Sequence, residues 1–113
     1  MHRRLSPFIA SKLARFRTAL EGRFGARLRE LVLYGSYARG EADEDSDVDV
    51  LVVVEGLTLD ERVEVIRLAH VADAADDEAV GLHPLPYSTA QVAELRAREK
   101  RLLMDIGREG IRL

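Results

Sequence analysis

Two short groups of residues in the centre of the chain have the types and spacing of a phosphate and metal site. Gly35 and Ser36 are adjacent, and after ten further residues Asp47 and Asp49 flank a valine. Glycine has no Cβ, so a phosphate can approach its backbone closely, and the serine offers a hydroxyl and an N–H group where a helix would start. Arg39 lies about one helical turn further on, where it could reach a phosphate or brace the acidic residues that follow.

The two aspartates predict a bound divalent cation. Asp47 and Asp49 stand two positions apart, so in a β-strand they point to the same face. They open an apolar run that ends at Val54, and two aligned carboxylates there repel each other unless a cation neutralises them. Oxygen ligands beside a phosphate site suit Mg²⁺ or Mn²⁺. Asp47 could instead be an acid of a solvated loop, because residues 41–49 hold six acids; this reading fits Asp49, between two valines, less well.

The order of the surrounding elements predicts an α/β fold in which helices cover a small sheet. The run before Val54 is apolar on both faces, which suits a central strand. Pro84 with Pro86 directs the end of the third strand toward an edge or an early exit from the sheet. The expected elements are a helix at 7–24, a strand at 28–34, a helical turn that Ser36 caps and Gly40 ends, a strand at 48–54, a helix from Thr58 to about Ala75, a strand at 78–85 and a last helix that begins at Ser88.

Local patterns indicate where the helices begin and which apolar residues share a face. Ser6 followed by proline is typical of a helix start, and Thr58 with Glu61 and Ser88 with Gln91 are capping-box patterns. Apolar residues recur at helical spacing in each helix: Ile9, Leu13, Phe16, Leu20 and Phe24 in the first, Leu59, Val63, Ile66 and Ala69 or His70 in the next long one, and Val92, Leu95, Leu102 and Ile106 in the last.

The composition is that of a single folded domain covering residues 1–113, with 47% hydrophobic and 33% charged residues. No apolar run approaches the roughly 20 residues of a membrane span, and the first residues lack a signal-peptide pattern. The absence of cysteine fits a reducing compartment, so we expect a cytoplasmic protein without membrane association. A net charge of −3 gives no support for direct binding to nucleic acid.

The central residues resemble the signature of the minimal nucleotidyltransferases, small relatives of the polymerase beta superfamily that includes kanamycin nucleotidyltransferase. In that family Gly-Ser is followed, after a similar interval, by Asp-x-Asp, and Arg39, Gly40 and Ser46 match further common features. The order and length of the elements extend the resemblance over nearly the whole chain. It implies a mixed sheet of three to four strands, binding of ATP with Mg²⁺, and transfer of a nucleoside monophosphate to an acceptor hydroxyl with release of pyrophosphate. Many members are antitoxins paired with a HEPN-domain ribonuclease toxin, and some adenylylate it, so a HEPN-domain partner is expected.

The third strand departs from the family pattern. Active members carry a third carboxylate there, which helps to hold a metal and to activate the attacking hydroxyl. Alignment on Ser88 places His83 at that position. A neutral histidine could accept a proton or bind a metal, although imidazole suits Mg²⁺ poorly, and it could also have no catalytic role. If the register of the strand differs, Asp77 or Glu78 would supply the acid.

Three functions are compatible with these residues. The first is an enzyme, with Asp47, Asp49 and His83 as catalytic residues and Gly35, Ser36 and Arg39 at the nucleotide. The second is a binding module, an antitoxin that neutralises a HEPN-domain partner by covering its surface. The third is one domain of a multi-subunit transferase. A chain of this length has little surface for recognising an acceptor, so the acceptor site would lie on a partner or at an interface with a second copy.

Overall fold

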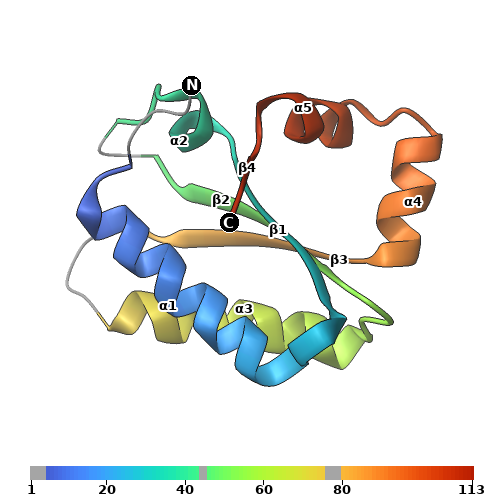
Figure 1. The fold of residues 1–113 in the computed structure, drawn as a ribbon, viewed down its shortest axis with the longest axis horizontal. Helices are drawn as coiled ribbons and strands as arrows, with labels where there is room; N and C mark the ends of the chain where they lie inside the picture. Colours follow the sequence, from blue (N-terminus) through green and yellow to red (C-terminus); the bar gives the residue numbers. More distant parts are fainter. Residues whose placement is uncertain (1–4, 44–45, 76–79) are drawn as a thin grey trace.

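The computed structural model describes residues 5–43, 46–75 and 80–113, which form a four-stranded sheet with helices on both faces (Figure 1). None of the helices in these ranges is both long enough and apolar enough to cross a membrane. In chain order the elements are α1 (Pro7–Phe24), the 3-10 helix η1 (Gly25–Arg27), β1 (Leu28–Tyr34), α2 (Ser36–Arg39), β2 (Val48–Val54), α3 (Leu59–Ala74), β3 (Leu82–Ser88), α4 (Thr89–Ala97), α5 (Arg101–Glu109) and β4 (Ile111–Arg112).

The sheet is mixed, with the strand order β3-β2-β1-β4. β1 runs antiparallel to both β2 and β4, whereas β2 and β3 are parallel. The expected α/β fold with a mixed sheet of three to four strands is therefore confirmed. β2 lies inside the sheet, as its apolar run predicts. The bounds of α1, β1 and β2 agree with the ranges predicted from the sequence.

Two hydrophobic cores lie on the two faces of the sheet. Alternate residues of β2 point to opposite faces, so Val48, Val50, Val52 and Val54 pack under α1 and α3, while Leu51 and Val53 pack against α4 and α5. Figure 1 shows α1 and α3 together along one side of the sheet and α4 and α5 along the other. Asp49, which lies between Val48 and Val50, therefore belongs to the α4–α5 face.

The predicted helix starts are confirmed, with one correction at α2. Ser6 Oγ accepts a hydrogen bond from the Ile9 N–H at 3.2 Å, and the capping boxes at Thr58 and Ser88 are both complete. Gly40 ends α2 in a left-handed conformation. Ser36, however, does not cap this helix, because Gly35 occupies the capping position and Ser36 is the first helical residue.

α3 buries a different face from the one that carries its large apolar residues. Leu59, Val63 and Ile66 are 79%, 65% and 42% exposed. The inward residues are Glu61, Val65, Ala69 and Ala72; of the expected set, only Ala69 is buried. The small alanines let α3 pack closely on α1 and β3, which leaves the larger apolar residues at the surface.

The third strand begins and ends later than the sequence predicts. It starts at Leu82 and continues through Pro84 and Pro86 to Ser88. β3 is an edge strand, as the prolines predict. Proline has no backbone N–H, and residues two positions apart in a strand direct their N–H positions to the same side. Both missing donors can therefore face the open edge of the sheet, where no strand needs them.

The region expected to form one last helix contains two. α4 ends where Glu99 adopts a φ of 53°, and the Lys100 N–H donates to the Leu95 carbonyl at 3.0 Å. A helix that ends with a left-handed residue usually has glycine at that position. Because a glutamate stands there, the sequence does not indicate that α4 ends. The new helix changes the inward face: Leu103 is buried, whereas Leu102 is 44% exposed.

The C-terminal residues form a short fourth strand that the sequence does not predict. Ile111 and Arg112 pair with Leu33 and Val32 of β1. α5 continues past Gly107 to Glu109, and the chain then turns back at Gly110 onto the free edge of β1. The fourth strand thus covers the edge that β2 leaves open.

Candidate active site

Gly35 lies against the carboxylate of Asp49. The antiparallel pairing of β1 with β2 places Tyr34 opposite Asp49, so the turn after β1 passes directly beside that side chain. Gly35 has a φ of 76°, and a Cβ built on it would collide with Asp49 Oδ2. Both the backbone conformation and the close approach therefore require glycine here.

His83 meets Asp49 from the other side. The parallel pairing of β2 with β3 places His83 opposite Asp49, and Nδ1 of the imidazole is 3.1 Å from Oδ1 of the carboxylate. An ionised carboxylate only accepts hydrogen bonds, so in the neutral imidazole Nδ1 is the donor and Nε2 is the acceptor nitrogen of the ring. The imidazole is 68% exposed and the carboxylate 27%, so the pair is open to a ligand.

Asp47 lies at the border of this group. It is exposed and precedes β2, in a loop where the Ser46 hydroxyl donates to Asp43 at 3.2 Å. Across residues 5–43, 46–75 and 80–113, no three His, Asp or Glu side chains gather closely enough to hold a metal ion. The alternative acids Asp77 and Glu78 lie outside the described residues. The structure thus brings Asp49 and His83 together, and Asp47 immediately precedes the strand that carries Asp49.

The other two predicted nucleotide residues lie on α2. The Ser36 hydroxyl makes no hydrogen bond to the described part of the chain. Arg39 Nε donates to Glu41 at 3.1 Å and its Nη1 donates to Glu109 at 3.4 Å; hydrogen bonds to Glu41 and Glu109 raise the pKa of this guanidinium above its usual range. Arg39 therefore pairs with Glu41 and with Glu109 of α5 and keeps further N–H donors for a ligand.

A hollow of about 280 Å³ opens beside Gly35, between the end of β1, α2 and α5. Tyr34 forms part of its wall. Burial, together with the charge of Asp49 and the proximity of Tyr87, raises the pKa of Tyr34 to about 12, so its phenol stays protonated and can donate a hydrogen bond. The remaining lining residues are Arg39, Leu102, Asp105, Ile106 and Glu109.

The α5 residues of this hollow are the part of the site that the sequence analysis missed. Asp105 and Glu109 bring two carboxylates next to the Gly35 turn. They lie about seventy positions along the chain from Gly35, and the contact depends on the return of the chain through α5. No local pattern of residues signals a contact of this kind.

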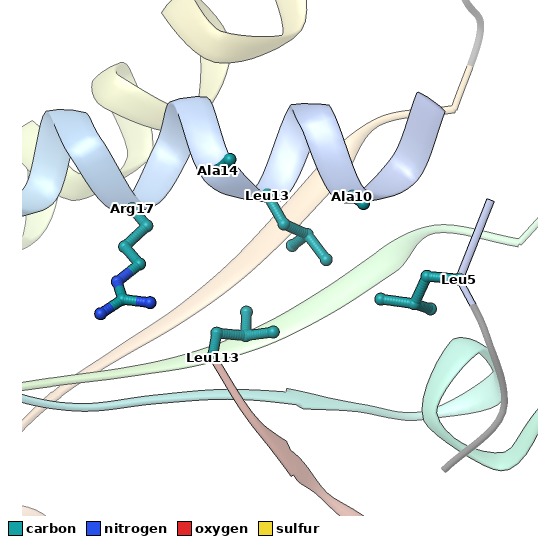
Figure 2. Close-up of a pocket in the computed structure, with 6 residues that line it drawn as sticks. All are labelled: Leu5, Ala10, Leu13, Ala14, Arg17 and Leu113. Carbon is teal, nitrogen blue, oxygen red and sulfur yellow. The ribbon is translucent and has the colours of Figure 1, made fainter. Parts of the chain in front are cut away.

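A second hollow, of about 220 Å³, lies between α1 and the C-terminal end of the chain. Figure 2 shows Leu13 and Leu113 facing each other across it, with Arg17 at its border. Both leucines belong to the core under α1, on the sheet face opposite to Asp49. Among its lining residues (Leu5, Ala10, Leu13, Ala14, Arg17 and Leu113) there is no acid, histidine or hydroxyl, so it lacks the groups for group transfer.

The mixed sheet, the glycine turn against a strand carboxylate and the helices on both faces define a nucleotidyltransferase fold. The sequence agrees: the chain belongs to the nucleotidyltransferase domain family, whose model matches residues 13–101. A solved structure described as a minimal nucleotidyltransferase is 31% identical to it, with a TM-score of 0.54 over 99% of this chain and 98% of the other. The family resemblance of the central residues is thereby confirmed.

Curated relatives point to the same family. The protein adenylyltransferase MntA of Thermococcus cleftensis is 53% identical over 47 residues, which are 42% of this chain and 46% of the relative. A protein of Methanocaldococcus jannaschii, assigned as a protein adenylyltransferase, is 50% identical over 44 residues, 38% of this chain and 44% of the relative. The matches thus span less than half the length of these relatives.

The fold also occurs in a toxin–antitoxin complex solved with AMP-PNP. One chain of that complex aligns with a TM-score of 0.53 and 21% identity, over 86% of this chain and 68% of its own length. At this identity the similarity concerns the fold.

Proposed function

We propose that this chain transfers a nucleoside monophosphate from ATP to a hydroxyl group of a partner protein, with the help of a divalent cation. The observation that carries this proposal is the placement of the Gly35 turn against Asp49, with His83 hydrogen-bonded to the same carboxylate. A triphosphate bound along the turn would then lie next to a carboxylate and a base.

The residues that would hold the metal and the nucleotide have suitable donor chemistry. Asp47 and Asp49 supply carboxylate oxygens, which suit Mg²⁺ or Mn²⁺, and the lack of a Cβ on Gly35 lets the turn approach the Asp49 carboxylate closely. The cation would neutralise charge on the carboxylates and on the phosphates. The free hydroxyl of Ser36 and the remaining N–H groups of Arg39 would bind phosphate oxygens.

His83 would handle the proton of the acceptor. The acceptor oxygen forms a bond to the α-phosphorus, the bond from that phosphorus to the bridging oxygen breaks, and pyrophosphate leaves. The hydroxyl loses its proton in this step. With Nδ1 donating to Asp49, Nε2 of His83 can accept that proton, so the histidine would replace part of what a third carboxylate does.

A HEPN-domain protein is the partner that we propose, in a cytoplasmic toxin–antitoxin pair. The support comes from relatives named as protein adenylyltransferases and from the toxin–antitoxin complex with the same fold. The chain itself has little surface for a large acceptor. The acceptor hydroxyl would therefore be presented by the partner, next to the open Asp49–His83 pair.

A second candidate is an antitoxin that acts by binding alone. Two observations favour it: the described residues contain no group of three side chains that could hold a metal ion, and a histidine stands where the family's third acid is expected. Transfer of AMP to the partner separates the two functions, because a binding module would inhibit the partner without changing its mass.

The nucleotide site is tested by thermal unfolding with and without ligands. A ligand that binds only the folded state raises its stability by mass action, so MgATP should raise the melting temperature more than ATP with a chelator does. The joint substitution Asp47→Asn and Asp49→Asn should abolish this difference. Equal stabilisation of the wild type and the double variant would remove the metal from the proposal.

A pair of glycine substitutions tests the turn itself. Gly35 and Gly25 both have positive φ values, 76° and 55°, but only a Cβ on Gly35 would meet Asp49. Gly25→Ala should therefore lose stability through backbone strain alone, and Gly35→Ala should lose more, because its Cβ also collides with Asp49. Only Gly35→Ala should also weaken MgATP binding. Unchanged MgATP affinity in a folded Gly35→Ala protein would contradict the assignment.

A further inference from the structure

An apolar stripe on α3 faces away from the rest of the molecule. Leu59, Val63 and Ile66 are 79%, 65% and 42% exposed, and they follow one another along one side of the helix. The inner side of α3 is already packed through Val65 and Ala69. Aligned large aliphatic side chains of this kind mark an interaction surface more often than isolated ones do.

The spacing along the stripe is that of a helix-pairing seam. The positions alternate by four and three residues: Leu59, Val63, Ile66 and then the exposed His70. Two helices that pack along their length present side chains to each other at this spacing. The stripe is thus suited to another helix lying along α3.

Two charged residues next to the stripe have opposite signs and form no salt bridge with any described residue. Asp60 follows Leu59 and Arg67 follows Ile66, so both lie on the same side of the stripe. They are one heptad, or about two helical turns, apart. The charge of Arg67 contributes to the lowered pKa of Glu64, after the hydrogen bond from Arg23. Asp60 and Arg67 remain available to an outside partner.

We propose that a second copy of this chain docks on the stripe, with the two α3 helices antiparallel around a two-fold axis. In this arrangement Val63 of each copy packs beside Ile66 of the other, and Leu59 lies near His70. Asp60 of each copy then faces Arg67 of the other. In an antiparallel helix pair, residues that flank the apolar seam on one side contact the equivalent flanking residues of the partner helix. The two-fold axis forms this ion pair twice.

The surface is complementary to itself, which selects a second copy over an unrelated helix. Asp60 and Arg67 lie on either side of the centre of the stripe, so they become neighbours when one helix is turned end to end against the other. A parallel pair would instead place Asp60 and Arg67 of one copy on the opposite side of the seam from those of the other copy, so this ion pair could not form. The antiparallel homodimer is therefore the arrangement that both the apolar and the charged residues fit.

The dimer leaves both candidate active sites open. α3 covers the sheet face opposite to Asp49 and His83. In Figure 1 α3 runs along the lower edge of the molecule, while α2 and α5 lie at the top. Dimer formation and nucleotide transfer can therefore be measured independently of each other.

Sedimentation velocity over a concentration series tests the interface. Stable interfaces bury about 1,200–2,000 Å², and a single helix on each copy lies at the low end, so the dimer should dissociate on dilution in the micromolar range. Val63→Glu should raise the dissociation constant at least tenfold, because two carboxylates would meet near the axis. Val71→Glu is the control: Val71 is 56% exposed on the same helix but off the stripe, and its substitution should leave the dimer unchanged.

Charge reversal tests the orientation of the two helices. Asp60→Arg and Arg67→Asp should each weaken the homodimer, roughly three- to tenfold at low ionic strength, because each creates two like-charged contacts. The double variant Asp60→Arg/Arg67→Asp should restore wild-type affinity. An equimolar mixture of the two single variants should form a heterodimer that is tighter than either homodimer.

Three results would overturn the proposal. The first is a wild type that stays monomeric up to about 100 µM, well above the micromolar range expected for a small interface; if the stripe became protected only in a complex with another protein, that protein would be its occupant. The second is a dimer that Val63→Glu does not affect. The third is a double charge reversal that fails to rescue the single variants.

Discussion

Asp49 lies at the centre of the candidate site, where three other residues of the site approach its carboxylate. Its Oδ1 atom accepts the hydrogen bond from His83 at 3.1 Å, its Oδ2 atom lies where a Cβ on Gly35 would be, and its charge contributes to the raised pKa of Tyr34. The proximity of Gly35 to Asp49 could be predicted from sequence, because the Gly-Ser motif follows one strand and the Asp-x-Asp motif begins the next, and the two strands are adjacent. The bond between Arg39 and Glu109 could not be predicted, since it depends on how α5 returns to α2.

The role of His83 can be tested by two substitutions. If its Nε2 atom accepts the acceptor proton, His83→Ala should lower the rate of transfer by roughly the 10²–10⁴-fold that is typical of lost acid–base catalysis. His83→Asp should retain activity or raise it, because it restores an oxygen ligand where Mg²⁺ prefers one. The measurement is single-turnover transfer from ATP. A rate that His83→Ala leaves intact would show that the histidine has no part in the chemistry.

At the scale of elements, a buried ion pair fixes the start of β3. Lys12 of α1 is fully buried, with Nζ 3.1 Å from Asp73 Oδ1, and it also donates to the carbonyl of Val80. Asp73 in turn accepts the Leu82 N–H with both oxygens, at 3.1 and 3.2 Å. These contacts secure β3 one residue before His83, although α1 is distant in sequence from α3 and β3.

A second ionic network ties the other end of α3 to the chain before β1. Glu61 accepts hydrogen bonds from Arg27 at 2.8 Å with each of its oxygens and from the Thr58 N–H at 3.0 Å. The Arg27 hydrogen bonds, with the Thr58 contact, lower the pKa of Glu61 to about 2 from a usual value near 4.5. The carboxylate therefore remains charged in the folded state well into acid.

The lowered pKa of Glu61 predicts a pH dependence of folding. A depressed pKa in the folded state contributes stability that is complete above the unfolded value of about 4.5 and is lost as the pH falls through about 2. Urea unfolding between pH 5 and pH 2 should show this loss, and Glu61→Gln should make the curve shallower there. Glu94→Gln, in an exposed pair within α4, is the control. Identical pH profiles for wild type and Glu61→Gln would contradict this account.

The elements that the sequence predicted well are those with local signals. Ser6, Thr58 and Ser88 each cap a helix through neighbours three residues away, so a short stretch of sequence contains the whole interaction. The start of β3 and the break between α4 and α5 depend on tertiary contacts and on a left-handed Glu99. The stripe on α3 is apolar enough to predict burial, yet the single chain buries the opposite face.

At the scale of the whole molecule, the two faces of the sheet have different tasks. The α4–α5 face carries Asp49, His83 and the hollow beside Gly35, whereas α1 and α3 cover the other face and leave the α3 stripe outside. A chain of 113 residues can therefore carry the Asp49–His83 pair on one face and an exposed apolar helix on the other. This separation explains how so small a domain could act within an assembly.

The most direct test of the proposed function is the mass of the partner after incubation with nucleotide. The chain is purified from its native cells with its partner, and the complex is incubated with MgATP and analysed by intact-mass spectrometry. The account predicts that the partner gains the mass of AMP, that the gain requires the divalent cation, and that Asp49→Asn abolishes it while the complex remains assembled. A partner whose mass stays unchanged with the wild-type chain, or rises equally with Asp49→Asn, would contradict nucleotidyl transfer by this site.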